Sequence, residues 1–301
     1  MKELFIARRF GTASQQMIDE ANAIIEEYSR QGFTLTLRQL YYQFVSRDLI
    51  ANKQSEYKRI GSIVNDARLA GLIDWDAIED RTRNLRSLPT WDSPAEIVKA
   101  VSQQFRVDLW DGQRHRPEVW IEKDALVGVI EPVCNEFRVP YFACRGYSSQ
   151  SEAYVASKRI SARDRIGQGT IIFHLGDHDP SGIDMTRDNE DRLEIFLGGH
   201  AGWILKRLAL NFDQVKKYNP PANPAKATDA RFAKYQAEHG DESWELDALD
   251  PTVIAALIRD NLMEIIDRKK WNVAKKREDT MKATLQRASQ RWDEVARMVG
   301  N

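Results

Sequence analysis

Two apolar runs that end in acidic residues constrain the fold of this chain more than any other feature. The first run, residues 119–121, ends at Glu122, and the second, residues 171–175, leads into Asp177 and Asp179 about fifty residues later. Each run reads as a short buried strand. The carboxyl ends of parallel strands meet at one edge of a sheet, where ligands bind. We therefore expect these three carboxylates to lie together at such an edge.

The order of elements around these runs is typical of a parallel sheet. Strands are predicted at residues 118–122, 139–144 and 170–176, and helices at residues 124–136 and 150–164. Connections of this kind are right-handed crossovers, which place helices against the sheet. The chain from about Pro251 onwards is mainly helical. The predicted fold class is α/β, with a helical C-terminal elaboration.

The N-terminal part has a different pattern. Amphipathic helices are predicted at residues 13–30, 36–50 and 55–70. The last two form a helix-turn-helix pattern, and residues 72–83 could supply the wing of a winged helix. A polar, turn-rich segment at residues 111–117 then suggests a domain boundary. The expected domains are a helical and winged-helix domain at residues 1–116 and an α/β domain at residues 117–301.

Composition limits the location and the partners of the protein. No run approaches the ~18 apolar residues that a membrane span needs, and the first residues are too charged for a signal peptide. The two cysteines form no C-x-x-C motif. We expect a cytoplasmic protein that binds no membrane. The net charge is −1, but residues 177–194 hold seven acids and two arginines, whereas residues 268–299 hold ten Lys or Arg and four acids. The basic tail is compatible with phosphate binding or with an ordinary solvated helix face.

The segment around Asp177 and Asp179 is the strongest candidate for chemistry. Residues two apart in an extended chain point to the same side, so both carboxylates should face one cleft. Like charges at such a distance repel unless a cation lies between them, and hard oxygen ligands suit Mg²⁺. The alternative is a turn in which the two Asp residues only cap the following helix.

These motifs resemble a known family. Glu122 in Ile-Glu-Lys-Asp, the Arg145-Gly146-Tyr147 turn and the Asp177-x-Asp179-Pro-x-Gly motif are similar to a Toprim domain in order and spacing. Upstream, the segment Thr-Leu-Arg-Gln-Leu-Tyr-Tyr that ends at Tyr42 is similar to the active-site tyrosine motif of the topoisomerase VI A subunit and its meiotic double-strand-break relatives. The resemblance covers roughly residues 34 to 185. It extends to compact stand-alone relatives found in phages and prophages.

The resemblance implies a set of roles. Glu122, Asp177 and Asp179 would be Mg²⁺ ligands, with Glu122 also counted as catalytic, and Tyr42 would be the nucleophile that joins a DNA phosphate. The implied fold is a winged helix followed by a Rossmann-like Toprim domain. The implied partners are double-stranded DNA, a second copy of the chain in a homodimer, and a separate ATPase. The chain begins almost at the helical domain, without the longer N-terminal region through which topoisomerase subunits engage that ATPase.

Helical periodicity distinguishes the two adjacent tyrosines. Tyr41 shares an apolar face with Leu40 and Phe44, whereas Tyr42 lies ~100° farther round, at the edge of that face. Arg38 is one turn before Tyr42, where a guanidinium could hold a phosphate and stabilise a developing phenolate. We therefore expect Arg38 to assist catalysis. The alternative is that Tyr42 is a boundary aromatic without chemistry.

The expected function is DNA cleavage by Mg²⁺-dependent tyrosine transesterification, as in a topoisomerase, which is an isomerase. Two alternatives stay open. If Tyr42 is inert, the same carboxylates could activate water, and the protein would be a metal-dependent nuclease. If the acids are only structural, it would be a non-catalytic DNA-binding regulatory module.

Overall fold

The N-terminal residues form a cluster of three amphipathic helices. The computed structural model describes residues 1–78, 88–199 and 202–300. The helices are α1 (Thr12–Arg30), α2 (Leu37–Ser46) and α3 (Gln54–Leu69). Their apolar faces meet in a core that includes Ile24, Leu40 and Ile60, all fully buried. Thr36 and Gln39 form a capping box that starts α2. The bounds of α1 and α3 agree with the sequence prediction within one residue, whereas α2 ends four residues before its predicted end.

The expected wing at residues 72–83 is described only as far as Ile78. In that part the chain forms a one-turn helix, η1 (Trp75–Ala77), and a single bridge between Leu35 and Ile78. Residues 79–83 lie outside the described residues. The helical cluster is therefore established, whereas the wing stays a prediction.

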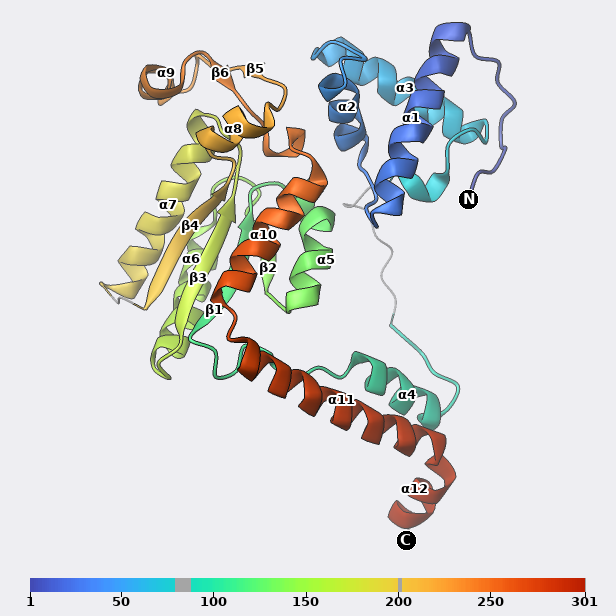
Figure 1. The fold of residues 1–301 in the computed structure, drawn as a ribbon, viewed down its shortest axis with the longest axis vertical. Coiled ribbons are helices and arrows are strands. Elements are labelled where there is room, and N and C mark those ends of the chain that lie inside the picture. The colour runs from blue at the N-terminus through green and yellow to red at the C-terminus, as the bar shows by residue number, and fades with distance from the viewer. Residues whose placement is uncertain (79–87, 200–201, 301) are drawn as a thin grey trace.

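A four-stranded parallel sheet forms the centre of the larger part of the molecule (Figure 1). Its strands are β1 (His115–Ile121), β2 (Tyr141–Ala143), β3 (Gly169–Leu175) and β4 (Trp203–Ala209). Their order in the sheet is β2-β1-β3-β4. Ile121 is paired with Leu175, so β1 and β3 end side by side. The mixed α/β class with a parallel sheet agrees with the sequence prediction.

Helices cover both faces of this sheet (Figure 1). They are α5 (Val127–Phe137) and α10 (Pro251–Ile265) on one face, and α6 (Gln150–Asp164) and α7 (Pro180–Leu197) on the other. Successive residues of β1 alternate between the two cores: Trp120 packs with Ile160 and Leu193, whereas Val119 and Ile121 pack on the other side. This period of two is the expected pattern for a strand buried on both faces.

Smaller elements surround the carboxyl ends of the strands. They are η2 (Asp124–Leu126), α8 (Phe212–Tyr218), α9 (Phe232–His239), η3 (Leu246–Ala248) and the two-stranded ribbon of β5 (Asn223–Pro224) and β6 (Glu242–Ser243). Ala248 of η3 packs into the core of the N-terminal helices. This contact joins the helical cluster to the edge of the sheet where β1 and β3 end.

A helical arm projects from the opposite end of the sheet (Figure 1). It consists of α4 (Pro94–Gln104), α11 (Arg268–Gln290) and α12 (Trp292–Val299). Helix α4 packs along α11, although the two are far apart in the sequence. The domain division at residue 116 stays a prediction. Within the described residues, no helix is long and apolar enough to cross a membrane.

Glu278 fixes the arm to the body of the protein. It is 2% exposed, and its carboxylate accepts hydrogen bonds from Val107 N at 2.9 Å and Arg138 Nη2 at 2.7 Å. Glu278→Ala leaves the guanidinium of Arg138 without this partner. We expect the free energy of unfolding to fall by about 3 kcal/mol, measured by urea denaturation.

The adjacent Asp279 is exposed and offers a matched control: Asp279→Asn should leave stability nearly unchanged. The hydrogen bonds from Arg138 hold the pKa of Glu278 well below its usual range. Its contribution is therefore full at neutral pH and is lost only under acidic conditions. Equal stability of the two variants at pH 7 would contradict this role.

Candidate active site

Glu122 and Asp177 meet where two neighbouring strands end. Glu122 follows β1 and Asp177 follows β3 after Gly176, and Oε2 of Glu122 accepts a hydrogen bond from the backbone N of Asp177 at 2.8 Å. Burial and the nearby charge of Asp179 raise the pKa of Glu122, although that hydrogen bond opposes the shift. The parallel register therefore brings these two sequence-predicted residues together.

The carboxylate of Asp177 is held by protein groups on both oxygens. Oδ1 accepts a hydrogen bond from Leu246 N at 2.8 Å, and Oδ2 forms an ion pair with Lys123 Nζ at 3.0 Å. The side chain is buried. Burial raises the pKa of Asp177 to about 7, and the charges of Glu122 and Asp247 add to this effect against Lys123. The two protonation states of Asp177 are therefore close in free energy at neutral pH, and Lys123 favours the ionised one.

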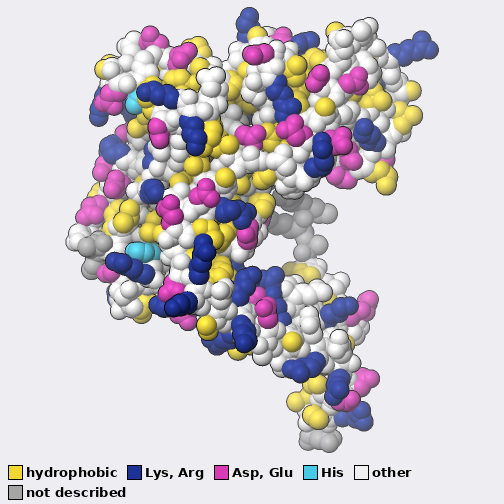
Figure 2. Space-filling view, viewed as in Figure 1, with side chains coloured by type: hydrophobic (Ala, Val, Ile, Leu, Met, Phe, Trp, Pro, Cys, Tyr) yellow, Lys and Arg dark blue, Asp and Glu magenta, His cyan; other side chains and the backbone are white. Residues whose placement is uncertain are grey.

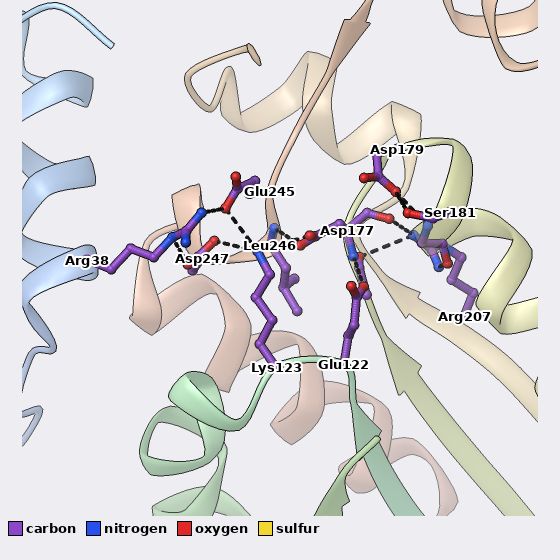
Figure 3. A network of polar contacts seen from close by, with 12 residues as sticks. Arg38, Glu122, Lys123, Asp177, Asp179, Ser181, Arg207, Glu245, Leu246 and Asp247 are labelled. Carbon is purple, nitrogen blue, oxygen red and sulfur yellow. Dashed lines mark hydrogen bonds and ion pairs between the residues drawn. The ribbon is translucent and has the colours of Figure 1, made fainter. Parts of the chain in front are cut away.

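Asp179 caps helix α7. Its Oδ1 accepts hydrogen bonds from Gly182 N at 2.6 Å and from Ser181 Oγ at 2.9 Å. Asp177 and Asp179 therefore point to different groups, as Figure 3 shows. The expectation that both carboxylates face the same cleft is not met, because Pro180 starts a helix at once and Asp179 becomes its N-cap.

Glycines allow the two ends of the site to approach each other closely. A Cβ on Gly176 would lie 3.0 Å from Oε2 of Glu122, and a Cβ on Gly182 would lie 2.3 Å from the carbonyl oxygen of Asp177. Side chains at these positions would displace the carboxylate or the turn. Steric constraints therefore explain why glycine occupies both ends of the motif Gly-Asp-x-Asp-Pro-x-Gly.

The donor atoms of the site suit Mg²⁺ in kind, because carboxylate oxygens are hard ligands. Within residues 1–78, 88–199 and 202–300, however, no group of three or more His, Cys, Asp or Glu side chains lies close enough together to hold a metal ion. In the structure the two oxygens of Asp177 are bonded to Leu246 N and Lys123, and Asp179 is directed at the start of α7. A site that used all three predicted carboxylates would need Asp177 to exchange Lys123 for the metal.

An acidic strap, residues 244–247, lies across the site (Figure 3). Trp244 pairs with His178 through two backbone hydrogen bonds, which align the strap with the turn after β3. Lys123 Nζ lies 3.0 Å from both Oε2 of Glu245 and Oδ1 of Asp247. The strap thereby places two further carboxylates beside Lys123.

Arg38 joins the N-terminal helices to this strap. Its Nε lies 2.9 Å from Oδ2 of Asp247, and its Nη2 bonds Glu245. Burial opposes ionisation of Glu245, but Lys123 and Arg38 outweigh it and lower the pKa of Glu245 to about 2. Arg38 was predicted to lie near a catalytic tyrosine, and in the structure it bridges that helix and the sheet edge.

Arg207 of β4 supports the turn from behind. Its guanidinium donates hydrogen bonds to the carbonyl oxygens of Asp177 at 2.6 Å and Gly182 at 2.9 Å, and to Thr186 Oγ1 at 2.6 Å. Burial lowers the pKa of Arg207 to about 10, while the carboxylates of the site oppose that shift. A buried cation so close to the carboxylates favours their ionised forms.

The sequence analysis did not assign roles to Lys123, Arg207 or Asp247. Lys123 could have been suspected because it directly follows Glu122. Glu245 and Asp247 alternate with apolar residues, which is a weak signal for two acids on one side. No local signal distinguishes Arg207 from other strand arginines.

Tyr42 is more deeply buried than its position on the helix predicts. It is 3% exposed and Tyr41 is 5% exposed, so both belong to the core. Tyr41 donates a hydrogen bond to Oδ1 of Asn52 at 2.9 Å. The guanidinium carbon of Arg38 lies 5.8 Å from the centre of the Tyr42 ring. Burial raises the pKa of Tyr42 to about 12, and the charges of Asp247 and Glu245 contribute to the shift.

Comparison with known proteins adds no family to this picture: no protein-family model and no curated protein matches the chain. What the chain does is therefore inferred from the geometry of its own residues.

Proposed function

We propose that this protein is a Mg²⁺-dependent DNA-cleaving enzyme that resembles the topoisomerase VI A subunit, with a winged-helix domain joined to a Toprim domain. The observation that supports this most is the meeting of Glu122 with Asp177 at the ends of adjacent parallel strands. Asp179 starts the next helix two residues later. Ligand sites of open parallel sheets lie at this edge.

The proposed metal would be held by Glu122, Asp177 and Asp179, and its binding would require Asp177 to leave Lys123 and Asp179 to leave its capping contacts with α7. When bound, Mg²⁺ would supply positive charge against the phosphate that is cleaved. The chain's own residues prepare the site: Arg207 fixes the backbone of the turn, and Lys123 favours the ionised form of Asp177.

Arg38 and Lys123 are the cations that would contact a DNA phosphate. In the structure they share Glu245 and Asp247 as partners. A phosphate carries the same charge and the same kind of acceptor oxygens as these carboxylates. The strap therefore occupies the place between the two cations that suits a phosphate, and DNA would have to displace it.

Tyr42 is the first candidate for the nucleophile. Its phenol oxygen would attack phosphorus, form a tyrosyl-DNA bond and leave a free hydroxyl on the other DNA end. The phenol must lose its proton for this step, and a pKa of about 12 opposes that loss. Release of the strap would remove the two carboxylates that contribute to the shift.

The burial of Tyr42 favours one alternative specifically, a nuclease in which water attacks. Incubation with supercoiled plasmid and Mg²⁺, followed by gels with and without protease treatment, distinguishes the candidates. A shift that protease reverses indicates a covalent adduct, free ends indicate water, and binding without cleavage indicates the non-catalytic DNA-binding module.

We also expect a two-fold homodimer, because cutting both strands needs one nucleophile for each strand. In the family that this chain resembles, the tyrosine of one protomer acts at the metal site of the other. Light scattering after size exclusion should therefore give twice the mass of 34.6 kDa. A strictly monomeric protein that still cuts both strands would contradict this expectation.

A further inference from the structure

The first half of helix α11 carries a dense group of exposed cations at the base of the arm. We call it the basic surface; its members are Arg268, Lys269, Lys270, Lys275, Lys276 and Arg277. Figure 2 shows Lys and Arg side chains gathered where the arm leaves the body. None of the six forms an ion pair with another described residue. By contrast, Arg138 and Arg259 nearby are both paired with glutamates.

Helix stability does not explain this arrangement. The first turn of α11 contains three cations and no acid. The amino end of a helix has a partial positive charge, so cations placed there destabilise the helix. Asp267 offsets this in part by capping Lys269 N and Lys270 N. A local arrangement that opposes stability is expected where residues serve a function.

The surface is also hollowed. Lys269, Lys270 and Arg277 line a cavity of about 620 Å³ between α11 and the turn at residues 107–112, with Val273 and Ala274 between them. Two acids, Asp108 and Asp111, lie on the opposite wall. The charge of Asp108 is matched by its ion pair with Arg116. The net charge facing the hollow is therefore positive.

The basic surface lies far from the carboxylates. Asp267 N bonds Gln113 Oε1, and Lys270 Nζ bonds the carbonyl of Gly112, so α11 begins beside the amino end of β1. Glu122 lies at the other end of that strand. Seven residues at ~3.3 Å each separate the two ends by roughly 20 Å. A duplex rises ~3.4 Å per base pair, so this span equals about six base pairs.

We propose that the basic surface binds the sugar-phosphate backbone of duplex DNA as a second contact, away from the phosphate that is cleaved. This proposal rests on the proposed function and extends it. Lys269 and Lys276, like Lys270 and Arg277, are seven residues apart, so cations repeat every ~10 Å along one side of the helix. Such a row suits a polyanion with regular charges. Backbone contacts carry no sequence information, so the contact adds affinity without sequence preference.

The test uses the full chain with Lys269, Lys270 and Arg277 all changed to Gln, which keeps a good helix former at each position. Binding of a labelled duplex is measured without Mg²⁺ at several salt concentrations. The slope of log K against log salt should become shallower by about 2 to 3, and affinity should fall to a similar degree for unrelated sequences. The control changes Lys2, Lys158 and Arg165 to Gln, which removes the same charge at exposed positions outside the basic surface and away from the carboxyl ends of the strands.

The outcomes separate this proposal from the proposed function. If the parent cleaves plasmid DNA but the triple variant keeps the parent's salt slope, the basic surface is not a DNA contact, although the enzyme assignment stands. Equal losses in both triple variants would show a general charge effect and overturn the proposal. If the triple variant of the basic surface keeps the parent's affinity for DNA but binds anionic lipid vesicles more weakly than the parent, the partner is a membrane surface and the proposal is overturned. A parent that neither binds nor cleaves DNA overturns both proposals.

Discussion

The Asp177→Asn variant should lose Mg²⁺-dependent DNA cleavage by about a hundredfold or more. Asn keeps the shape of the side chain and an oxygen that can accept the hydrogen bond from Leu246 N. It lacks the negative charge that would hold the metal. Cleavage of supercoiled plasmid, measured as an initial rate with Mg²⁺ in excess, checks this expectation.

The same variant should be more stable than the parent when no metal is present. Burial raises the pKa of Asp177 to about 7, so ionisation of this group opposes folding. A raised carboxyl pKa gives stability that is full at low pH and is lost as the pH rises through the folded-state value. Asn has no charge to desolvate, so its melting temperature should exceed that of the parent by a few degrees above pH 7 and should approach it under acidic conditions.

Glu122→Gln and Glu190→Gln complete this experiment. Glu122→Gln keeps an acceptor for the backbone N of Asp177 and should lose cleavage as severely. Glu190 is an exposed acid on α7 outside the site, so Glu190→Gln should cleave at the parent rate. Cleavage at the parent rate by a folded Asp177→Asn or Glu122→Gln protein would falsify the metal-site assignment.

The sheet and its helices were predictable because their signals are local. Helix α6 begins after Ser149, which caps it, and its span at residues 150–164 agrees with the sequence prediction. The apolar runs of β1 and β3 also indicated that these strands are buried in the sheet. Because the two strands pair in parallel and end side by side, Glu122 and Asp177 lie close together.

Two local sequence signals make opposite predictions for the orientation of the Asp179 side chain. Alternation in an extended chain predicts that it shares a side with Asp177. An Asp before Pro at the start of a helix predicts an N-cap. The second signal prevailed, because Pro180 ends the extended segment at once and Gly182 N needs an acceptor. Strand periodicity does not hold for Asp177 and Asp179, because β3 ends at Leu175.

The strap could not be derived from local patterns. Lys123 and Glu245 are 122 residues apart, and Arg38 and Glu245 are 207 residues apart. The burial of Tyr42 has the same origin. Residues of η3 pack on α2 and cover a helix edge that the periodicity of α2 alone leaves open to solvent. Contacts of this kind depend on the complete tertiary structure.

The Tyr42→Phe variant should form no covalent adduct with DNA, while its fold stays intact. The change removes only the phenol oxygen, and Phe fills the same space in the core around α2. If Tyr42 is the nucleophile, adduct formation by the parent should also rise about tenfold for each pH unit below a pKa of about 12, because only the phenolate attacks. Adducts are measured as labelled DNA retained on the denatured protein.

Tyr41→Phe and Arg38→Ala are the comparisons that give this result its meaning. Tyr41→Phe loses its hydrogen bond to Asn52, which lowers stability by about 1 kcal/mol, but it should keep the adduct. Arg38→Ala should weaken adduct formation, because its guanidinium lies beside the Tyr42 ring and beside the strap. If Tyr42→Phe instead cleaves DNA at the parent rate while Asp177→Asn does not, water is the attacking group. The high pKa of the buried phenol then reflects a core residue, and the nuclease alternative replaces transesterification.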